Sequence, residues 1–295
     1  MSQSATIITT ALQASNDGSP LRETTAIGGG DISQAVRLRT DQSIYLLKWS
    51  ERGLPGFFDA EVHGLKLLAS TGAIRVPEVI AWQSDVEEQP DFLLLEWLAA
   101  PPSANRGVAA EALGHALATL HKATAPSYGL DRDNYIGATP QPNGWMESWL
   151  EFFRERRLRF QAALAQRQGR LSGARARRME RLLDRLDTWI DEQAVQPALL
   201  HGDLWGGNFI IGPGRVPALI DPAVFYGDRE ADLAFTTLFG GFPESFYRAY
   251  EEAWPLAAGW QERRDLYNLY HLLNHLNLFG EGYGGSVDAI LQRYV

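Results

Sequence analysis

The stretch LLHGDLWGGNFI, residues 199–210, places a histidine, an aspartate and an asparagine among glycines, with apolar residues on both sides. The apolar ends are typical of short strands, and the glycines between them are typical of a tight loop. In this loop the carboxylate of Asp203 precedes the amide of Asn208 by five residues. An Asp beside a Gly often only bonds its own backbone in a turn, so the meaning of the pair depends on the rest of the chain.

A second aspartate follows a short apolar segment, VPALIDPA at residues 216–223, so that Asp221 lies thirteen residues after Asn208. The segments FIIG and VPALI predict a hairpin that brings Asn208 and Asp221 together. Carboxylate and amide oxygens suit Mg²⁺, a hard cation that bridges nucleotide phosphates. The spacing of Asp203 and Asn208 is that of the protein-kinase loop H-R-D-L-x-x-x-N, whose Asp receives the proton of the substrate hydroxyl and whose Asn binds the metal. We therefore expect Asp203 to be the catalytic base and Asn208 and Asp221 to be metal ligands.

The arrangement of elements along the chain predicts an α+β fold. The sequence predicts strands at residues 24–27, 34–40, 42–50, 76–82 and 90–98, and helices are expected at 4–14 and 57–70. Helical patterns follow at 108–123, 145–166, 171–193 and in two or three segments between 229 and 295. We expect a small N-terminal lobe with an antiparallel sheet, residues 1–98, and a larger, mainly helical C-terminal lobe, residues 99–295. The boundary is expected near residues 99–103.

The first lobe supplies candidates for binding a nucleotide. Phosphoryl transfer needs a cation on the α/β-phosphates, an acid that fixes this cation, and a loop over the phosphates. Lys48 closes an apolar strand in a chain with only three lysines, and Glu61 lies in the helix that follows. An edge lysine is often only solvated, and a helical Glu usually faces solvent. Because the first lobe offers both the cation and the acid that phosphoryl transfer needs, we predict that Lys48 and Glu61 form the phosphate-anchoring pair.

The remaining nucleotide contacts are expected from two backbone segments and one side chain. A triple glycine between the first two strands offers N–H groups to phosphates, although it also suits an ordinary hairpin loop. The backbone at the end of the last strand is expected to bond the adenine edge, and an apolar residue on the face of the lysine is expected to pack against the ring. The glycines are Gly28, Gly29 and Gly30, the hinge is Glu96, Trp97 and Leu98, and the packing residue is Leu46.

Four segments resemble the fructosamine (ketosamine) kinase family, and the resemblance covers nearly the whole chain. They are HGDLWGGN (residues 201–208), NYIGATPQPNGWMESWLEFFRERRL (134–158), DPAVFYGDREADLA (221–234) and LYHLLNHLNLFGEGY (269–283). The HGD and Asn combination is shared with aminoglycoside and choline kinases, whereas Trp205 and DREADLA are more specific. The resemblance implies a two-lobed protein-kinase-like fold and phosphorylation, with ATP and Mg²⁺, of the sugar 3-hydroxyl of a ketosamine, which is the adduct of an amine with a sugar.

The resemblance also implies a role in protein deglycation, because the 3-phosphate is labile and the free amine is regenerated. It assigns Trp205, beside the base, to stacking on the substrate sugar, although plain packing also explains a Trp in a chain with nine of them. Many relatives carry Cys in the glycine loop where this chain has Asp31, and a chain without cysteine has no thiol switch. The preferred sugar (fructosamine, ribulosamine or erythrulosamine), the free or protein-bound state of the amine, and the oligomeric state stay open.

Two alternative functions stay open at this point. An aminoglycoside- or choline-type phosphotransferase also suits an acidic chain, because its substrates are cationic. A nucleotide-binding pseudokinase that acts as a scaffold is the second alternative, but a scaffold has no need of the full set Lys48, Asp203, Asn208 and Asp221. Turnover of a panel of ketosamines, an aminoglycoside and choline separates the three functions.

The composition argues against several other classes of function. The formal net charge of −9 argues against a nucleic-acid-binding protein, which needs a basic surface. The chain has no cysteine, which excludes disulfides, thiolate metal sites and cysteine nucleophiles. No apolar run approaches the ~20 residues that cross a bilayer, and the first residues lack the basic segment of a signal peptide. We therefore expect a cytoplasmic protein without a membrane partner.

The histidines have simple structural explanations. His271 and His275 have the i, i+4 spacing of a zinc helix, but neither the Glu of a metalloprotease motif nor a third ligand accompanies them. We expect them to face the helical core or to bond backbone. His201 is expected to hold the backbone of the catalytic loop.

The remaining charged residues are assigned to local structure. Asp228 and Glu230 suit a helix N-terminus, and Asp232 is a candidate brace for the catalytic loop. The arginines between residues 154 and 185 predict a solvated helical face.

Overall fold

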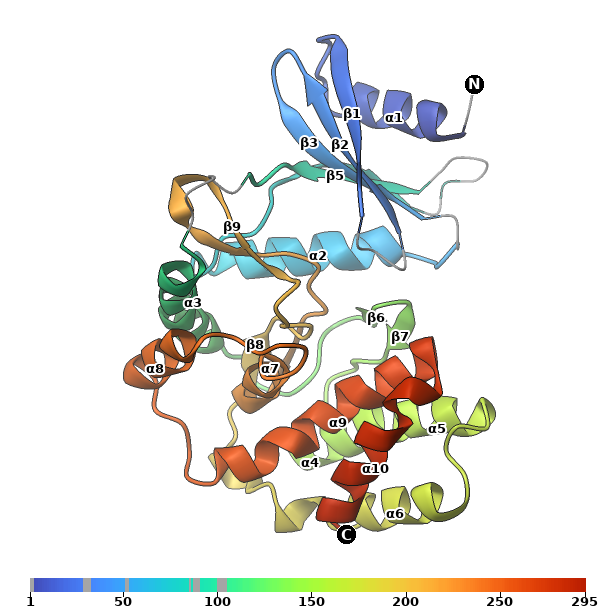
Figure 1. Cartoon of the computed structure of the whole chain (residues 1–295), viewed down its shortest axis with the longest axis vertical. Coiled ribbons are helices and arrows are strands. Elements are labelled where there is room, and N and C mark those ends of the chain that lie inside the picture. Colours follow the sequence, from blue (N-terminus) through green and yellow to red (C-terminus); the bar gives the residue numbers. More distant parts are fainter. Residues whose placement is uncertain (1–2, 29–32, 51–52, 85, 87–90, 100–104) are drawn as a thin grey trace. The chain divides into compact units, whose positions relative to one another are not determined.

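The computed structural model describes residues 3–28, 33–50, 53–84, 86, 91–99 and 105–295, which form two units (Figure 1). The first unit contains the chain up to Ala109 together with Phe209–Pro222, and the second contains Ala110–Asn208 and Ala223–Val295. The expected lobes, 1–98 and 99–295, differ from this division in two respects. The first unit extends to Ala109, and it includes residues 209–222, because Leu219 donates its N–H to the carbonyl of Arg75 at 2.9 Å. The expected boundary at residues 99–103 lies, except for Ala99, outside the described residues.

The first unit is built on an antiparallel sheet with the strand order β1-β2-β3-β5-β4 (Figure 1). The strands are β1 (Leu21–Ile27), β2 (Gln34–Thr40), β3 (Ile44–Trp49), β4 (Val79–Gln83) and β5 (Phe92–Glu96). The helices are α1 (Gln3–Ala14) and α2 (Phe57–Ser70). The five strands and two helices that the sequence predicts for this part of the chain are therefore confirmed.

Strand β3 has two chemically different faces. Tyr45, Leu47 and Trp49 are buried in one apolar cluster with residues of α1. Successive side chains of a strand point to opposite faces, so Leu46 and Lys48 lie on the other face. On that face Lys48 meets α2. The alternation of side chains along β3 therefore places the apolar core residues on one face and the residues of the candidate site on the other.

The predicted hairpin after Asn208 is confirmed. Strand β9 (Phe209–Ile211) pairs antiparallel with β10 (Pro217–Leu219), and Phe209 lies opposite Leu219. Asn208 directly precedes β9, and Asp221 is the second residue after β10. The tight connection includes a short helical turn, Pro213–Arg215, in which Gly214 has a φ of 71°.

The second unit is mainly helical and contains two small strand pairs. Its helices are the C-terminal part of α3 (Arg106–His121), then α4 (Trp149–Phe152), α5 (Phe160–Arg167), α6 (Gly173–Leu183), α7 (Arg229–Phe235), α8 (Glu244–Ala253), α9 (Trp260–Phe279) and α10 (Gly284–Arg293). The strand pairs are β6 (Asn134–Ile136) with β7 (Thr139–Gln141) and β8 (Ala198–Leu200) with β11 (Phe225–Gly227). Across the described ranges, no helix is both long and apolar enough to span a membrane.

Two of the predicted helices differ in detail from the structure. The helix expected at 145–166 begins at Trp149 and includes a π-helical segment, Phe153–Arg159, between α4 and α5. The helix expected at 171–193 was predicted too long, because α6 ends at Leu183 and short 3₁₀ turns follow at Leu186–Thr188 and Glu192–Ala194. Leu186 and Ile190 are still buried, so packing in the core satisfies the apolar pattern without a continuous helix.

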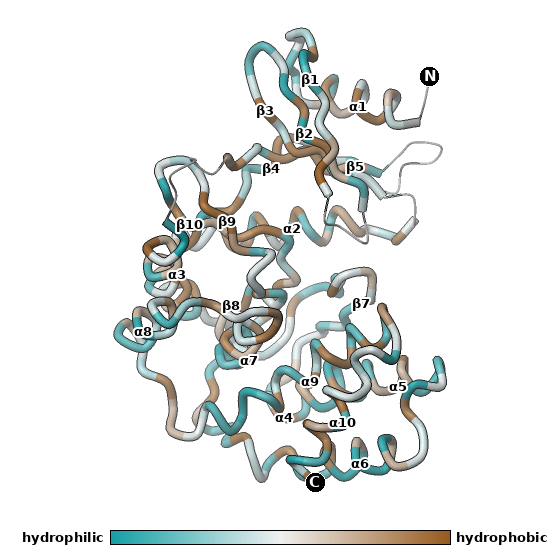
Figure 2. The backbone as a smooth tube through the Cα atoms, viewed as in Figure 1, coloured by the Kyte–Doolittle hydropathy of each residue, from teal (hydrophilic) through white to brown (hydrophobic). Residues whose placement is uncertain are grey.

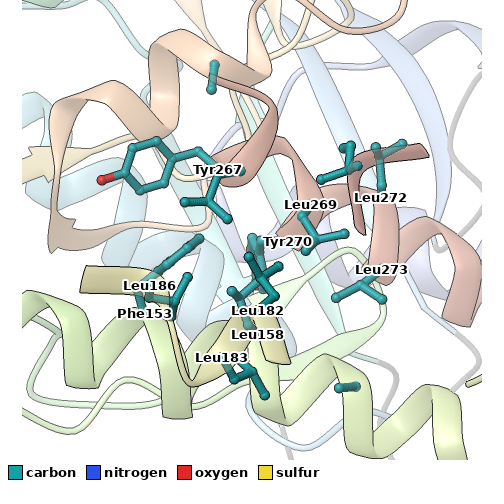
Figure 3. Packing of buried hydrophobic residues seen from close by; sticks show 14 of the residues in the cluster. Phe153, Leu158, Leu182, Leu183, Leu186, Tyr267, Leu269, Tyr270, Leu272 and Leu273 are labelled. Atoms are coloured by element: carbon teal, nitrogen blue, oxygen red, sulfur yellow. The ribbon is translucent and has the colours of Figure 1, made fainter. Parts of the chain in front are cut away.

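The core of the second unit forms where α5, α6, α9 and α10 meet. Figure 3 shows Leu158, Leu182, Leu183 and Leu273 in this core, all of them fully buried. Hydrophilic residues alternate with the hydrophobic ones along α6 (Figure 2), as expected for a helix with one buried face, whereas α9 is buried on all sides between Leu266 and Asn274. The core fixes α7 and α9, and these helices carry several residues of the candidate site.

One residue contradicts the prediction of a solvated arginine face. Arg157, in the π-helical segment, is buried, with its guanidinium carbon 4.0 Å from the ring centroid of Phe225. It donates to the carbonyl of Pro142 and to Oδ1 of Asn143, both at 2.7 Å. Aromatic ring faces and neutral oxygen acceptors therefore stabilise the buried guanidinium group of Arg157. The charge pattern of the sequence alone would have placed this group at the surface.

Candidate active site

In the first unit, Lys48 lies between two carboxylates. Its Nζ is 2.7 Å from Oε1 of Glu61 in α2 and 2.7 Å from Oδ1 of Asp221. Lys48 and Glu61 are buried, whereas the side chain of Asp221 is 45% exposed. The predicted contact between Lys48 and Glu61 is therefore confirmed, and Asp221 is a third member of the same group.

The electrostatics of this group keep Lys48 charged. Burial alone would lower the pKa of its ammonium group, but Asp221 and Glu61 raise that pKa above its ordinary value. The pKa of Glu61 is also raised, because burial and the nearby Asp221 outweigh the opposing effect of Lys48. A permanently charged, buried ammonium group with one exposed carboxylate partner is suited to binding an anionic oxygen from solvent.

The backbone of Asp221 is strained. Its φ is 55°, in the left-handed region that residues other than glycine rarely adopt. Such strain tends to occur at functional positions. It holds an exposed carboxylate beside Lys48, and carboxylate oxygens are hard donors that fit Mg²⁺.

Two of the backbone N–H groups of the expected adenine-binding hinge, Glu96 to Leu98, are engaged within the first unit. The N–H of Glu96 donates to the carbonyl of Glu78 at 2.9 Å, and the N–H of Trp97 donates to the carbonyl of Ile44 at 3.2 Å. Both donors are engaged within the sheet because β5 continues its pairing to its very end. Of the three predicted hinge residues, Leu98 is therefore the one whose N–H remains a candidate donor to the adenine edge.

The other predicted nucleotide contacts are only partly described. Gly28 is exposed at the end of β1, whereas Gly29, Gly30 and Asp31 lie outside the described residues. Leu46 is half-buried on the face of β3 that carries Lys48. Its role against adenine stays a prediction.

In the second unit, Asp203 and Asn208 are in direct contact. The Asn208 amide nitrogen donates to Oδ2 of Asp203 at 3.0 Å and to the backbone carbonyl of Asp203 at 2.8 Å. Since the nitrogen faces Asp203, the amide oxygen Oδ1 faces away from it and is the atom suited to a cation. The sequence spacing thus places a base candidate and a metal-ligand candidate in one loop, with the orientation of the amide fixed.

Asp232 of α7 braces this loop, as expected. Its carboxylate accepts the N–H of His201 at 2.7 Å, the N–H of Gly202 at 2.9 Å and a ring N–H of His121 at 3.2 Å. Burial alone would raise the pKa of Asp232, but the bonds from His121 and Gly202 lower it below its ordinary value. Burial lowers the pKa of His121, so we assign a neutral ring that donates from Nε2 to Asp232 and accepts from the Tyr250 hydroxyl at Nδ1, 2.8 Å away.

The backbone of the loop requires glycine at position 202 and uses the side chain of His201 just before it. Gly202 has a φ of 80°, and a Cβ there would lie 2.0 Å from the carbonyl oxygen of Ala223. The N–H of Asp203 donates to Nδ1 of His201 at 3.3 Å, which confirms that His201 holds the loop's backbone. Both features fix where the Asp203 carboxylate points.

We expect Asp232→Asn to lower kcat by about 10- to 100-fold, because a misplaced catalytic group costs that much. The asparagine offers only one oxygen, so its amide nitrogen faces one of the N–H donors of His201 and Gly202. A buried N–H left without an acceptor costs about 1–3 kcal/mol of stability, which thermal unfolding measures. The matched control is Asp228→Asn, because Asp228 caps α7 by accepting the N–H of Glu230 and does not bond the loop. Equal kcat values for the two variants would contradict the bracing role.

The other assignments to local structure are also tested. The cap formed by Asp228 is confirmed, and Glu230 forms an ion pair with Arg263 at 2.7 Å. His275 bonds the carbonyl of His271 at 2.8 Å, and His271 is buried, as expected for histidines of a helical core.

Trp205 lies on the exposed side of the loop and is 37% exposed. Its indole ring lies over Gly207, where a Cβ would approach a ring atom to 2.3 Å. The ring meets Phe239 edge to face, with 6.2 Å between the centroids. Trp205 is therefore not a core residue, and its role in stacking on the sugar stays a prediction.

Two residues of the site were not expected from the sequence. His121 lies in α3, more than a hundred residues before Asp232, and nothing near it in the sequence marks it. Phe239 precedes Gly240 and Gly241. That glycine pair is the signal that indicates an irregular backbone after α7.

Comparison with known sequences identifies the family. A family model described as fructosamine kinase matches residues 3–295. The "Probable ketoamine kinase" of Lactiplantibacillus plantarum is 42% identical over 275 residues, which cover 93% of this chain and 95% of the relative. The chloroplastic "Protein-ribulosamine 3-kinase" of Arabidopsis thaliana is 38% identical over 272 residues, which cover 92% of this chain and 82% of the relative.

Solved structures agree with these relatives. The "Putative fructosamine-3-kinase" of Thermobifida fusca has a TM-score of 0.84 and 33% identity, with 96% of this chain and 97% of that chain covered. The aminoglycoside phosphotransferase APH(4)-Ia has a TM-score of 0.64 and 17% identity, with 99% of each chain covered, and this likeness shows the fold alone. The predicted α+β, protein-kinase-like fold is confirmed. The chain belongs to the fructosamine kinase family.

Proposed function

We propose that this protein transfers the γ-phosphoryl group of ATP to the sugar 3-hydroxyl of a ketosamine. The reaction forms a bond between O3 and phosphorus, breaks the bond between the γ-phosphorus and the β,γ-bridging oxygen, and yields ADP and a ketosamine 3-phosphate. The contact of the Asn208 amide with the Asp203 carboxylate is the observation that carries the proposal. It presents an oriented base and an outward-facing amide oxygen, which is what transfer from a metal-bound nucleotide requires.

Asp203 acts as the base in this proposal. Its carboxylate accepts the hydrogen bond of the sugar 3-hydroxyl, orients O3 towards phosphorus and takes its proton as the new bond forms. Asn208 fixes the carboxylate through its amide nitrogen, and Asp232 fixes the loop through two backbone N–H groups. The chain thus contributes mainly position and charge, which suits a loose transition state.

The group around Lys48 serves the nucleotide. Lys48 binds the α/β-phosphates and Glu61 holds its ammonium group, while the backbone of residues 96–98 and Leu46 contact the adenine. Asn208 and Asp221 supply hard oxygen donors for Mg²⁺, and their oxygens fit this cation. When bound, Mg²⁺ neutralises charge on the β- and γ-phosphates. The glycines Gly28, Gly29 and Gly30 cover the phosphates in this proposal.

The names of the relatives indicate the substrate class. Ketoamine and ribulosamine substrates are an amine joined to a sugar, so we assign this chain a glycated amine, free or on a protein, and a role in deglycation. The acidic chain, with a net charge of −9, suits a substrate that carries a protonated amine. We place this activity in the cytoplasm.

The proposal is tested by measuring ADP release with fructose-lysine, ribulose-lysine, an aminoglycoside and choline. We expect turnover of the ketosamines alone. Turnover of the aminoglycoside or of choline without turnover of ketosamines would make the protein a phosphotransferase of another class. ATP binding without turnover of any compound would make it a scaffold.

We expect Asn208→Ala to raise the Mg²⁺ concentration needed for half-maximal rate by at least ~10-fold, since even an outer-shell partner of a metal costs that much. The side chain supplies both the expected metal ligand and the bond that orients Asp203. Titration of Mg²⁺ at saturating ATP and ketosamine measures the shift. An unchanged Mg²⁺ requirement would remove Asn208 from the metal site.

A further inference from the structure

Aromatic side chains gather around the exposed ring of Trp205, and we define them as the aromatic cluster: Trp205, Phe239, His275, Phe279 and Tyr283. Phe239 lies 6.2 Å from Trp205 and 4.8 Å from His275, between ring centroids. His275 in turn lies 5.5 Å from Phe279 and 5.0 Å from Tyr283. The cluster therefore runs without a break from the catalytic loop to the C-terminal end of α9.

Much of the cluster is exposed to solvent. Phe239 is 45% exposed and Phe279 is 49% exposed, besides Trp205. Large apolar side chains gathered at one exposed place are unusual in a soluble domain and mark a binding site. The cluster joins the loop that carries the base, because the N–H of Trp205 donates to the Asp203 carbonyl at 3.2 Å.

The backbone of Phe239 adds an independent observation. Its φ is 54°, and a bulky residue in the left-handed region is a genuine outlier. Gly240 and Gly241, which follow it, tolerate such angles without cost. The chain thus maintains a strained backbone that keeps a phenyl ring half exposed next to Trp205, which points to a functional demand on that ring.

His275 gives the cluster a hydrogen-bond acceptor. Its Nδ1 bonds the carbonyl of His271 at 2.8 Å, so Nδ1 carries the proton and Nε2 is the acceptor. Burial lowers the pKa of His275, so the ring is neutral at neutral pH. The side chains of the cluster therefore present ring faces and neutral acceptors on His275 and Tyr283, and none of them carries a positive charge.

We propose that the aromatic cluster binds the amine-bearing arm of the ketosamine, so that the enzyme recognises the protonated nitrogen and the alkyl chain beyond it as well as the sugar. This inference rests on the proposed function. Aromatic faces attract an organic ammonium group through their negative potential, and they also cover its methylene groups. The neutral His275 acceptor takes an N–H of that group. The cluster is thus a specificity site that distinguishes an amine adduct from the same sugar without an amine.

The experiment compares two substrates that differ in one atom. One is fructose-lysine, and the other is the ether analogue with oxygen in place of the bridging nitrogen, which carries no charge there. For the wild-type protein we expect kcat/KM to favour the amine by about 10-fold, the size of one desolvated cation–π contact. We expect Phe239→Leu and Phe279→Leu each to reduce this preference several-fold through KM, with kcat nearly unchanged.

Two further variants sharpen the test. His275→Phe keeps a ring and removes the acceptor, so a reduced preference in this variant assigns the N–H bond to His275. Trp82→Leu is the control, because Trp82 is 41% exposed on β4 and outside the cluster. We expect its amine preference to equal that of the wild-type protein.

The outcomes separate this inference from the proposed function. If the wild-type protein phosphorylates fructose-lysine and the amine preference survives in Phe239→Leu and Phe279→Leu, the inference is wrong and the proposed function stands. If the wild-type protein phosphorylates neither these two compounds nor ribulose-lysine, the proposed function and the inference both fall.

Discussion

Replacing Asp203 by Asn is expected to lower kcat by about 10³-fold, within the range of a lost general base, while the Kd for ATP stays within about 2-fold. Asn keeps the size of the side chain but does not accept a proton at neutral pH. The amide of Asn208 then faces a second amide instead of a carboxylate, so the substituted side chain orients with its oxygen towards Asn208. Isothermal titration with ATP and single-turnover kinetics measure the two quantities separately.

The control for this variant is Trp205→Phe, which leaves the base in place. We expect it to retain most of kcat, since phenylalanine keeps an aromatic ring at this position. A catalytic rate of Asp203→Asn within 10-fold of the wild-type rate would be incompatible with the role of Asp203, because loss of a base costs ~10² at the least.

The second large effect is expected for Lys48→Met, which should lower kcat/KM for ATP by about 10²- to 10³-fold, the cost of removing one preorganised charge contact. Met keeps the apolar stem and removes the ammonium group. The buried Glu61 then loses its partner, and loss of one member of a buried pair costs about 3 kcal/mol of stability. We expect both effects, in steady-state kinetics and in chemical denaturation.

A double variant separates the structural role of Lys48 from its catalytic role. Lys48→Met combined with Glu61→Met replaces the ion pair with apolar groups, which is often neutral for stability. We therefore expect denaturation to recover towards the wild-type value while kcat/KM for ATP stays low. Recovery of both would mean that Lys48 acts only in folding.

Much of the first unit could be predicted because its signals are local. The alternation in β3 separates Tyr45 and Leu47 from Lys48, and helical periodicity places Glu61 on the inner side of α2. A lysine near the end of a strand, followed by a helix with a glutamate on its buried side, therefore predicts the ion pair of Lys48 and Glu61. The strained φ of Asp221 and its contact with Lys48 depend on a segment 173 residues away, and no local pattern encodes them.

The second unit was harder to predict because its site depends on tertiary packing. The spacing of Asp203 and Asn208 predicts their contact, since the connection between β8 and β9, residues 201–208, is short and leaves few conformations. The sequence marks Asp232 as a candidate brace only because it lies in the DREADLA segment. Its partner His121 lies in another helix, which the sequence does not indicate. Arg157 shows the limit of charge patterns, because its aromatic neighbours come from β11 and α9.

The hinge illustrates a third kind of limit. The sequence indicates where β5 ends, but it does not indicate which backbone N–H groups form hydrogen bonds within the sheet. The N–H groups of Glu96 and Trp97 are engaged through Glu78 and Ile44, which come from different parts of the chain. Only the folded sheet shows that, among the three N–H groups of the hinge, that of Leu98 is the remaining candidate donor.

The most direct test of the central claim is a phosphorus NMR measurement of the product formed from ATP and fructose-lysine. The account predicts one phosphomonoester per ADP, coupled to the proton on carbon 3 of the sugar, and no such signal with Asp203→Asn. Conversion of ATP to ADP with inorganic phosphate as the initial product, or a phosphate on another hydroxyl group, would contradict it.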